Sequence, residues 1–291
     1  MSAVWDEGRE PEAPGWRFWR SSVPAPLAPY VVAISGYVEH GCNPILRAEF
    51  PSCVVPLIIV LDDAFVLHQT NGHEVRRRLD RTFLAGLHRR PAVIGSEGSA
   101  ACIEVDLTPL GARRLLRTEL IELSGLVASL SALAPHLETA LVDALAQATD
   151  WQGRFRCVER FLCRHILHDD RDDPRIATAC LLLQSSDGPP SIARLSKMLG
   201  VSRKHLNALF KTQIGCTPKA FSRIARFSRA VHRLQQASSP SDVALADLAA
   251  WCGYADQSHF NRDFKAFAGA SPTDILARTL PGEGGVSAVG T

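Results

Sequence analysis

The C-terminal part of the chain contains one sequence pattern twice. The segment IARLSKMLGVSRKHLNALFKTQIGCTP, residues 192–218, aligns with LADLAAWCGYADQSHFNRDFKAFAGASP, residues 245–272, if the second copy has one extra residue in its turn. In each copy an amphipathic pattern precedes a glycine and a second amphipathic pattern follows it. Glycine tolerates the left-handed backbone that ends a helix sharply. The repeat therefore predicts two pairs of short helices, each joined by a tight turn.

The second helix of each pair has two distinct sides. Phe210 in the first copy and Phe260, Phe264 and Phe267 in the second lie on the side that we expect to be buried. In a helix-turn-helix the second helix enters the major groove of DNA, and its outward residues meet base edges. The outward residues that we expect to contact bases are Lys204, Asn207, Ala208, Gln257, Ser258, Asn261 and Arg262.

A third helix is expected between the two copies. Residues 218–236 have helical hydrophobic spacing, and Pro218 suits a first-turn position. A helix of ~19 residues is ~29 Å long, close to the ~34 Å helical turn of DNA. Such a connector would place the two reading helices in successive major grooves. Residues expected to contact phosphates are Ser202, Arg203, Lys211, Arg223, Arg226 and Lys265, with Ser202 and Asp256 also expected as N-caps.

These residues resemble a known family. The tandem motif, the connecting helix and the run GYADQSHFNRDFKAFAGASP are similar to the DNA-binding domain of AraC/XylS-type transcriptional regulators, over about residues 175–280. The resemblance implies a bacterial, sequence-specific transcription factor whose other region senses a signal or mediates dimerisation. The runs FLAGLHRRPAVIG and VDLTPLGARRLL resemble the N-terminal region of one subgroup of these regulators. The resemblance to AraC/XylS-type regulators implies double-stranded DNA as a partner. It leaves open whether a small-molecule effector, a homodimer or a contact with RNA polymerase is involved.

The distribution of charge agrees with a DNA-binding C-terminal part. From Pro174 onward the chain has 14 Lys and Arg against 7 Asp and Glu, a net charge of +7. The remainder has 18 against 23, a net charge of −5. A basic domain beside an acidic one is typical of a nucleic-acid reader joined to a domain that does not bind DNA.

The N-terminal part is expected to be β-rich. Short apolar or β-branched runs separated by turn residues predict strands at residues 30–38, 53–61, 64–69, 92–95 and 101–107. The sequence thus predicts an α+β chain, with a small β-barrel-like N-terminal domain and a helical segment followed by an all-α tandem helix-turn-helix domain. Alternation along Val55, Leu57, Ile59 and Leu61 would suit an apolar ligand cavity or a plain core.

The helical pattern begins after the last expected strand. Thr108 is the expected N-cap of the first helix, and residues 169–174, DDRDDP, are a linker candidate. An apolar stripe would pack on the β domain or pair two subunits; it comprises Leu115, Leu116, Leu120, Leu123, Leu126, Val127 and Leu130. We place the β-rich, sensor-like domain at residues 1–110, a helical segment and linker at 111–173, the DNA-binding domain at 174–281 and a flexible tail at 282–291.

Other classes of protein find less support. The eight cysteines form no C-x-x-C pair, which favours core thiols in a reducing cytoplasm over a redox sensor. No signal peptide and no apolar run of ~18 residues occurs, so we expect a cytoplasmic chain. His68, His73 and Glu74 have the wrong spacing for the metal site of a metal-dependent β-barrel enzyme. A β-barrel enzyme with a helical appendage is the alternative that remains open. No cofactor, metal or catalytic residue is predicted, and the cysteines lack the zinc cluster of a DNA-repair alkyl acceptor.

Overall fold

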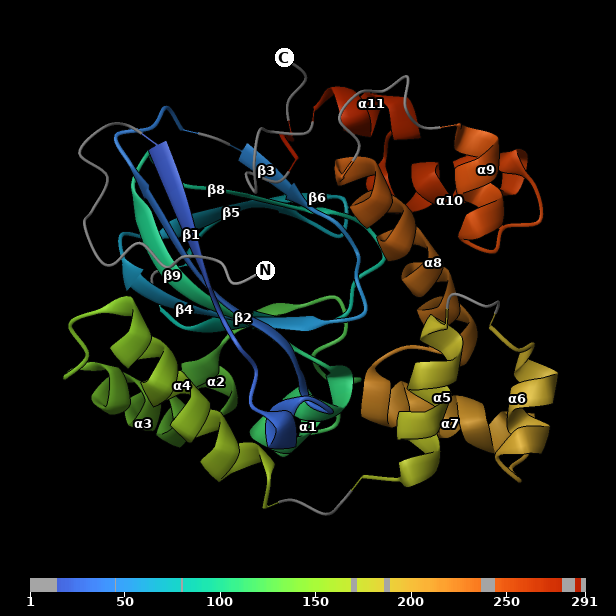
Figure 1. Cartoon of the computed structure of the whole chain (residues 1–291), viewed down its shortest axis with the longest axis horizontal. Coiled ribbons are helices and arrows are strands. Elements are labelled where there is room, and N and C mark those ends of the chain that lie inside the picture. Colours follow the sequence, from blue (N-terminus) through green and yellow to red (C-terminus); the bar gives the residue numbers. More distant parts are fainter. Residues whose placement is uncertain are drawn as a thin grey trace.

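The computed structural model describes residues 15–44, 46–79, 81–168, 172–185, 189–236, 244–278 and 286–288. Two antiparallel β-sheets lie face to face, helices cover the outer face of one sheet, and the helical C-terminal part lies beside them (Figure 1). The six-stranded sheet has the order β1-β2-β9-β4-β7-β10 and the four-stranded sheet β3-β8-β5-β6. The strands are β1 Gly15–Ser21, β2 Val31–His40, β3 Leu46–Glu49, β4 Val55–Asp62, β5 Phe65–Thr70, β6 His73–Leu79, β7 Phe83–Ala85, β8 Ala92–Gly95, β9 Ala100–Leu107 and β10 Val127–Ser129.

The five predicted strands are present as β2, β4, β5, β8 and β9, and the α+β class is confirmed. The prediction of a barrel is wrong, because the two sheets are not joined by strand pairing in the described part of the chain. Near the edge strands β6 and β10 a side chain takes the place of backbone pairing. Arg77 Nη2 donates to the carbonyl oxygen of Val127 at 2.5 Å. The domain is therefore an open sandwich.

Strand β4 presents its two faces to two different surroundings. Val55, Leu57 and Ile59 are buried in the core between the six-stranded sheet and the helices. Ile58 on the opposite face of the strand packs against the hydrophobic residues between the two sheets. Of the two alternatives that the sequence left open for these residues, the structure supports a plain core for Val55, Leu57 and Ile59. Side chains on a strand alternate in direction, and the sequence pattern does not say which buried face meets a cavity.

The helices of the N-terminal part are η1 Ala25–Leu27, α1 Pro109–Leu116, α2 Leu130–Leu133, α3 Pro135–Leu145 and α4 Trp151–Ile166. Thr108 caps α1 as predicted, since its side chain accepts a hydrogen bond from the backbone N–H of Gly111 at 3.1 Å. The predicted apolar stripe is not one helix, because α1 ends at Leu116 and Arg117 adopts a left-handed φ of 54°. Leu120 and Leu123, in the turns that follow, are at most 2% exposed within this chain. The stripe therefore provides no helix pair for a homodimer.

The C-terminal part consists of α5 Pro174–Gln184, α6 Ile192–Met198, α7 Arg203–Ile214, α8 Pro218–Gln235, α9 Leu245–Trp251, α10 Gln257–Ala268 and α11 Pro272–Ala277. Helix α8 runs between a lower group, α5–α7, and an upper group, α9–α11 (Figure 1). The linker residues 169–171 lie outside the described residues. Asp172 beside them is held by two arginines of α1: Arg113 Nη1 lies 3.3 Å from Oδ1, and Arg114 Nε donates to Oδ2.

The expected flexible tail is attached at one point. Val286 is buried, and its carbonyl oxygen accepts a hydrogen bond from Ala48 of β3 at 2.8 Å. Ser287 pairs with Arg47 in an antiparallel bridge. Residues 286–288 therefore extend the edge of the four-stranded sheet, and residues 282–285 and 289–291 lie outside the described residues.

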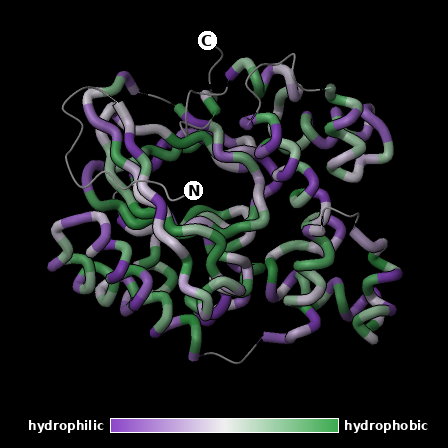
Figure 2. The backbone as a smooth tube through the Cα atoms, in the orientation of Figure 1, coloured by the Kyte–Doolittle hydropathy of each residue, from purple (hydrophilic) through white to green (hydrophobic). Residues whose placement is uncertain are grey.

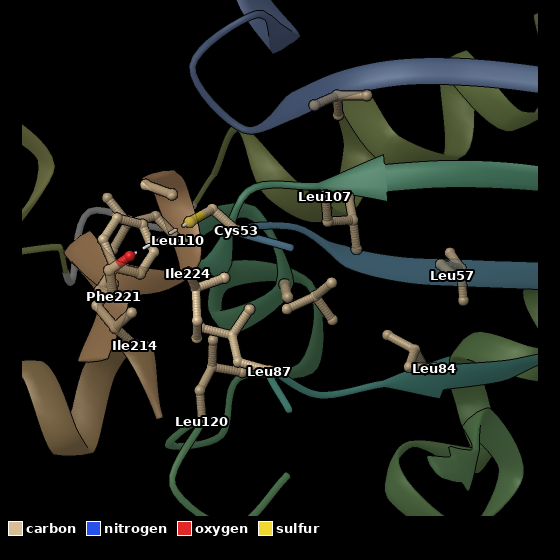
Figure 3. Close-up of a cluster of buried hydrophobic side chains, with 14 of the residues drawn as sticks. Cys53, Leu57, Leu84, Leu87, Leu107, Leu110, Leu120, Ile214, Phe221 and Ile224 are labelled. Carbon is tan, nitrogen blue, oxygen red and sulfur yellow. Dashed lines mark hydrogen bonds between the residues drawn. The ribbon is translucent and has the colours of Figure 1, made fainter. Parts of the chain in front are cut away.

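The hydrophobic core does not divide at the linker. One cluster of buried side chains continues from the six-stranded sheet through α1 and α4 to the helices of the C-terminal part. Hydrophobic residues dominate the strands, whereas the helices alternate in hydropathy (Figure 2). At the junction Leu87 and Leu120 lie near Ile214, Phe221 and Ile224 of the C-terminal part (Figure 3). Among the described residues, no helix has the length and apolar character needed to cross a membrane.

Candidate nucleic-acid interface and regulatory pocket

The two helix pairs in the C-terminal part are built alike. In the first pair the backbone N–H of Val201 donates to the carbonyl oxygen of Ser196 at 3.0 Å. In the second, Tyr254 donates to Ala249 at 2.9 Å. Both bonds close the turn around a glycine with a positive φ, 66° at Gly200 and 77° at Gly253. The sequence repeat is therefore a structural repeat, and α7 and α10 occupy equivalent positions.

Both second helices begin at the predicted N-caps and end at equivalent glycines. The Ser202 side chain accepts a hydrogen bond from the backbone N–H of His205 at 3.1 Å, and the Asp256 side chain accepts one from His259 at 2.6 Å. Gly215 and Gly269 end the two helices in the left-handed conformation. These caps fix the length and direction of both helices, so their exposed faces are held in defined positions.

The predicted base-contacting residues lie on the exposed faces of α7 and α10. On α10, Gln257, Ser258, Asn261 and Arg262 are all exposed. Arg262 Nε donates to the backbone carbonyl of Ser258 at 3.3 Å, which leaves the rest of the guanidinium for other partners. On α7, Lys204 and Ala208 are exposed and Asn207 is half-buried.

The predicted phosphate contacts fall into two groups. Ser202, Arg203 and Lys211 on the first motif and Lys265 on the second are exposed, so their side chains can reach a ligand. The arginines of α8 are already engaged within the protein. Arg223 Nη2 lies 2.6 Å from Oδ1 of Asp263 on α10.

Two further arginines of α8 hold the second motif from the same helix. Arg226 Nη1 donates to the carbonyl oxygen of Gly253 at 3.1 Å, and its guanidinium lies 4.9 Å from the Tyr254 ring centre. Arg229 donates to the last carbonyl oxygens of α5 and α9: Gln184 at 2.8 Å, Ser185 at 2.6 Å and Cys252 at 3.3 Å. Cations at helix C-termini are stabilising. The geometry gives these arginines a structural task that their spacing alone did not reveal.

A basic cleft lies between the two motifs. It has a volume of about 650 Å³ and lies among the start of α6, the first half of α8 and the start of α10. Lys219, His259 and Arg262 line it, together with Arg223 and Asp263. Sequence analysis missed Lys219 and His259. The signal for Lys219 was its position one turn before Arg223 on the connecting helix.

A second cavity, of about 310 Å³, lies between the two β-sheets. Its walls combine aromatic side chains with a few polar ones, the usual composition of a small-molecule site. Phe50 and Leu87 are among its lining residues. The Phe50 ring also packs edge-on against Phe227 of α8, with ring centres 6.1 Å apart. The wall of the cavity and the connecting helix therefore share a contact.

The sandwich also touches the first motif directly. The backbone N–H of Ile121 donates to the carbonyl oxygen of Thr212 on α7 at 3.4 Å. A Cβ atom on Gly215 would lie 2.8 Å from the Leu120 carbonyl oxygen, so the two backbones are in close contact. The C-terminal end of α7 thus rests on the turn that follows α1.

The cysteines in this region are poor candidates for redox chemistry. All eight are free, and none belongs to a metal-binding group in the described part of the chain. Burial raises the pKa of Cys53 to about 12 and that of Cys252 to about 11. A thiol with a raised pKa is a weak nucleophile at neutral pH, which favours a packing role.

Comparisons with known proteins concern mainly the C-terminal part. A family model described as a helix-turn-helix domain matches residues 195–278. The HTH-type transcriptional regulator GbdR of Pseudomonas aeruginosa is 25% identical over 117 residues, 40% of this chain and 30% of GbdR. The arabinose operon regulatory protein of Escherichia coli K12 is 27% identical over 157 residues, 49% of this chain and 52% of that protein. The chain thus matches about a third to a half of the length of these curated relatives.

A comparison with solved structures matches a protein over most of this chain. ToxT from Vibrio cholerae is 13% identical, with a TM-score of 0.48, and the similarity covers 86% of this chain and 98% of that one. The curated relatives named above are transcriptional regulators. They favour a regulator over the β-barrel enzyme that the sequence left open.

Proposed function

We propose that this chain is an AraC-type, sequence-specific transcriptional regulator that binds two successive major grooves through its helix-turn-helix domain, residues 195–278. One observation carries the proposal. Helices α7 and α10 have matching turns and matching caps, both pack against α8, and both expose polar faces. The 18 residues of α8 span about 27 Å, which suits a separation near one helical turn of DNA.

In this proposal the base contacts come from the exposed face of each reading helix. Arg262 is suited to a bidentate contact with a guanine, and Asn207 and Asn261 to an adenine. The methyl group of Ala208 suits a thymine methyl group. Lys204, Gln257 and Ser258 complete the set, and each good bidentate contact is worth about 1–3 kcal/mol of discrimination.

Phosphate contacts fix the position of the protein on the duplex. We assign them to Ser202, Arg203, Lys211 and Lys265. We add Lys219 because it lines the basic cleft between the motifs. We reassign Arg223 and Arg226 to holding α10 and its turn against α8, since their side chains are already bonded there.

We further propose that the sandwich regulates DNA binding through a small molecule bound between its sheets. Support comes from the position of the cavity. Phe50 lines it and contacts Phe227, and Leu87 lines it within the cluster that includes Leu120 and Ile224. A ligand shifts a protein only through different affinities for two states. Displacement of Phe50 or Leu87 would therefore change the position of α8 relative to α7.

The test is selection of bound DNA from a random duplex library with the full chain. We expect an enriched site with two half-sites about 10–10.5 base pairs apart. Arg262→Ala is expected to relax the preference at one position of that site, whereas Arg76→Ala, an exposed arginine of β6, leaves all preferences unchanged. Absence of any enriched site at low salt contradicts the proposed function. Unchanged base preferences for Arg262→Ala contradict the assignment of α10.

A further inference from the structure

The cavity between the sheets has an unusual wall. On β9, Cys102, Glu104 and Asp106 line the cavity, whereas Ile103 and Val105 face the helices. Strand β9 lies between β2 and β4, so these carboxyl groups stand in the middle of a sheet. Carboxyl groups are seldom placed there unless they are paired.

The neighbours of these carboxyl groups carry no positive charge. Glu104 lies opposite Ser35 on β2 and Ile58 on β4. Asp106 lies opposite Ala33 and Pro56. Neither carboxylate has a hydrogen bond or ion pair to any residue that the structure describes.

A third carboxyl group comes from the other sheet. Glu49, on β3, lines the same cavity and is close enough to Glu104 and Asp106 to repel them. Glu49 is exposed to solvent, yet enough protein surrounds its carboxyl group to raise its pKa, the combination expected at the mouth of a cavity. Two sheets therefore direct negative charge into one cavity.

The neighbouring Glu39 shows how this domain neutralises a buried carboxylate with its own residues. Its Oε2 lies 3.1 Å from Arg47 Nη2 and also accepts a hydrogen bond from the Tyr37 hydroxyl. Arg47 has the one permanent positive charge among the described residues that line the cavity, and it is already engaged with Glu39. Glu104 and Asp106 have no such arrangement.

The raised pKa values of the three carboxyl groups also indicate that the protein supplies no positive charge to neutralise them. Burial first, and then repulsion between the groups, raises the pKa of Glu104 well above its usual value and that of Asp106 to about 6. Burial also raises the pKa of Glu49, against the opposing effect of Arg47. Such groups are destabilising until a cation joins them, and groups of this kind gather at functional sites.

The rest of the wall indicates the kind of cation. Phe18, Phe50, Phe65 and Phe83 line the cavity and provide aromatic surface, which attracts both apolar groups and organic cations. The described residues include no group of three or more His, Cys, Asp or Glu side chains that could hold a metal ion. The volume of about 310 Å³ suits a small organic molecule.

We propose that the cavity binds an organic cation, an amine with an apolar body, whose positive charge is attracted by the carboxyl groups of Glu104, Asp106 and Glu49. The apolar body lies against the phenylalanine rings, near Phe50. The regulatory part of this inference rests on the proposed function: the bound amine is then the signal that changes DNA binding, through the contact between Phe50 and Phe227.

The test uses the full chain and four probes of equal carbon number: hexylamine, hexamethylenediamine, hexanoate and hexanol. Binding is measured by calorimetry and by the shift of the thermal unfolding temperature. We expect at least one amine to bind with a Kd at or below about 1 mM, and hexanoate and hexanol to bind at least about tenfold more weakly. The three chemistries share an alkyl chain, so the comparison isolates the charge.

Three variants remove the proposed contacts without changing side-chain size: Glu104→Gln, Asp106→Asn and Glu49→Gln. Each is expected to weaken amine binding by about tenfold or more, because a charge-assisted bond is lost. Glu74→Gln, an exposed carboxylate on β6, is the matched control and is expected to change nothing. The unfolding transition of each variant, measured without ligand, shows whether the variant is folded. Glu49→Gln lies in the other sheet from Glu104 and Asp106, so it tests the site independently.

Saturable binding by neither amine overturns the proposal, as does equal binding of hexanoate or hexanol. Unchanged amine affinity in the three variants overturns the assigned residues. DNA binding to the enriched site is measured in the same samples, so the two proposals fail separately. Absence of DNA binding by the wild type both with and without amine defeats the proposed function alone. Amine binding that leaves DNA affinity unchanged supports the cation site and overturns its role as the regulatory signal.

Discussion

Arg223 on the connecting helix and Asp263 on the second reading helix form an ion pair that fixes α10 against α8. Their closest atoms, Nη2 and Oδ1, lie 2.6 Å apart, and Nε lies 3.2 Å from the same oxygen. The Asp263 side chain is 4% exposed, and the Arg223 guanidinium lies 5.1 Å from the Phe267 ring centre. A carboxylate on the inner side of a DNA-reading helix thus neutralises an arginine that would otherwise be available to DNA.

We expect Arg223→Ala to destabilise the protein by about 3 kcal/mol, because removal of one partner leaves Asp263 buried and uncompensated. Urea unfolding of the full chain measures this loss. The double variant Arg223→Ala with Asp263→Ala should recover part of it, as a double-mutant cycle requires for interacting residues. A phosphate-binding role would give the opposite pattern: unchanged stability and a weaker salt dependence of DNA binding.

Lys211 and Lys265 occupy equivalent positions in the two motifs. Each is expected to contribute one phosphate contact. Lys211→Ala or Lys265→Ala should therefore reduce the magnitude of the negative slope of log K against log salt by about 0.9. Affinity should fall for all sequences alike. DNA titrations over a range of salt concentrations give the slope. Arg76→Ala is the control, and a variant that changes the preferred sequence would contradict the assignment to phosphates.

Gly215 and Gly269 end α7 and α10 with φ values of 88° and 70°. Alanine at either position costs about 1–2 kcal/mol through left-handed backbone strain. At Gly215 the added Cβ would also lie 2.8 Å from the Leu120 carbonyl oxygen, whereas at Gly269 nothing lies within 4 Å. Gly215→Ala should therefore lower the thermal unfolding temperature more than Gly269→Ala does. Equal effects would mean that α7 does not rest on the turn after α1.

The buried carboxyl groups predict an unusual dependence of stability on pH. Asp106 has a folded-state pKa of about 6, above its unfolded value, so the folded state binds its proton more tightly. Its contribution is fully present below the unfolded pKa and is lost as pH rises through about 6. The loss is on the order of 2 kcal/mol, allowing for screening by water in the cavity.

The matched measurement compares wild type with Asp106→Asn in thermal unfolding from pH 4 to pH 8. As pH rises over this range, the wild type should lose stability relative to the variant. Other groups around the cavity, namely Glu104, Glu49, His88, Tyr37 and Cys102, remain in both proteins, so the difference isolates Asp106 to first order. A difference independent of pH would contradict the raised pKa. Saturation with a bound amine should reduce the difference.

The reading domain could be predicted in detail because its signals are local. Ser202, Asp256 and Gly253 determine caps and turns within a few residues, and the repeat supplies an internal check on each. The arginines of α8 escaped prediction for the opposite reason. The partners of Arg223 and Arg229 lie 23 to 45 residues away along the chain, and helical periodicity contains no information about them.

The N-terminal domain shows a different limit. Alternation in CIEVDL, residues 102–107, separates Glu104 and Asp106 from Ile103 and Val105, but polar residues in alternation usually face water. Only the facing sheet shows that they are enclosed. The leucines after Leu116 likewise have helical spacing, yet the chain leaves the helix at the left-handed Arg117, so Leu120 and Leu123 lie in turns and Leu130 begins the separate helix α2. Tertiary packing, not local preference, determines both outcomes.

The hydrophobic core that runs unbroken from the sandwich to the reading helices limits how such a protein can be re-engineered. An exchange of the first 173 residues for another sensor would uncover Ile214, Phe221 and Ile224, which the sandwich and its loops now cover. Such a chimera would expose an apolar patch and be prone to aggregation. To remain soluble it would need the surfaces around Cys53, Leu87 and Leu120 transplanted with the C-terminal part, so the division of the chain into exchangeable modules does not follow the position of the linker.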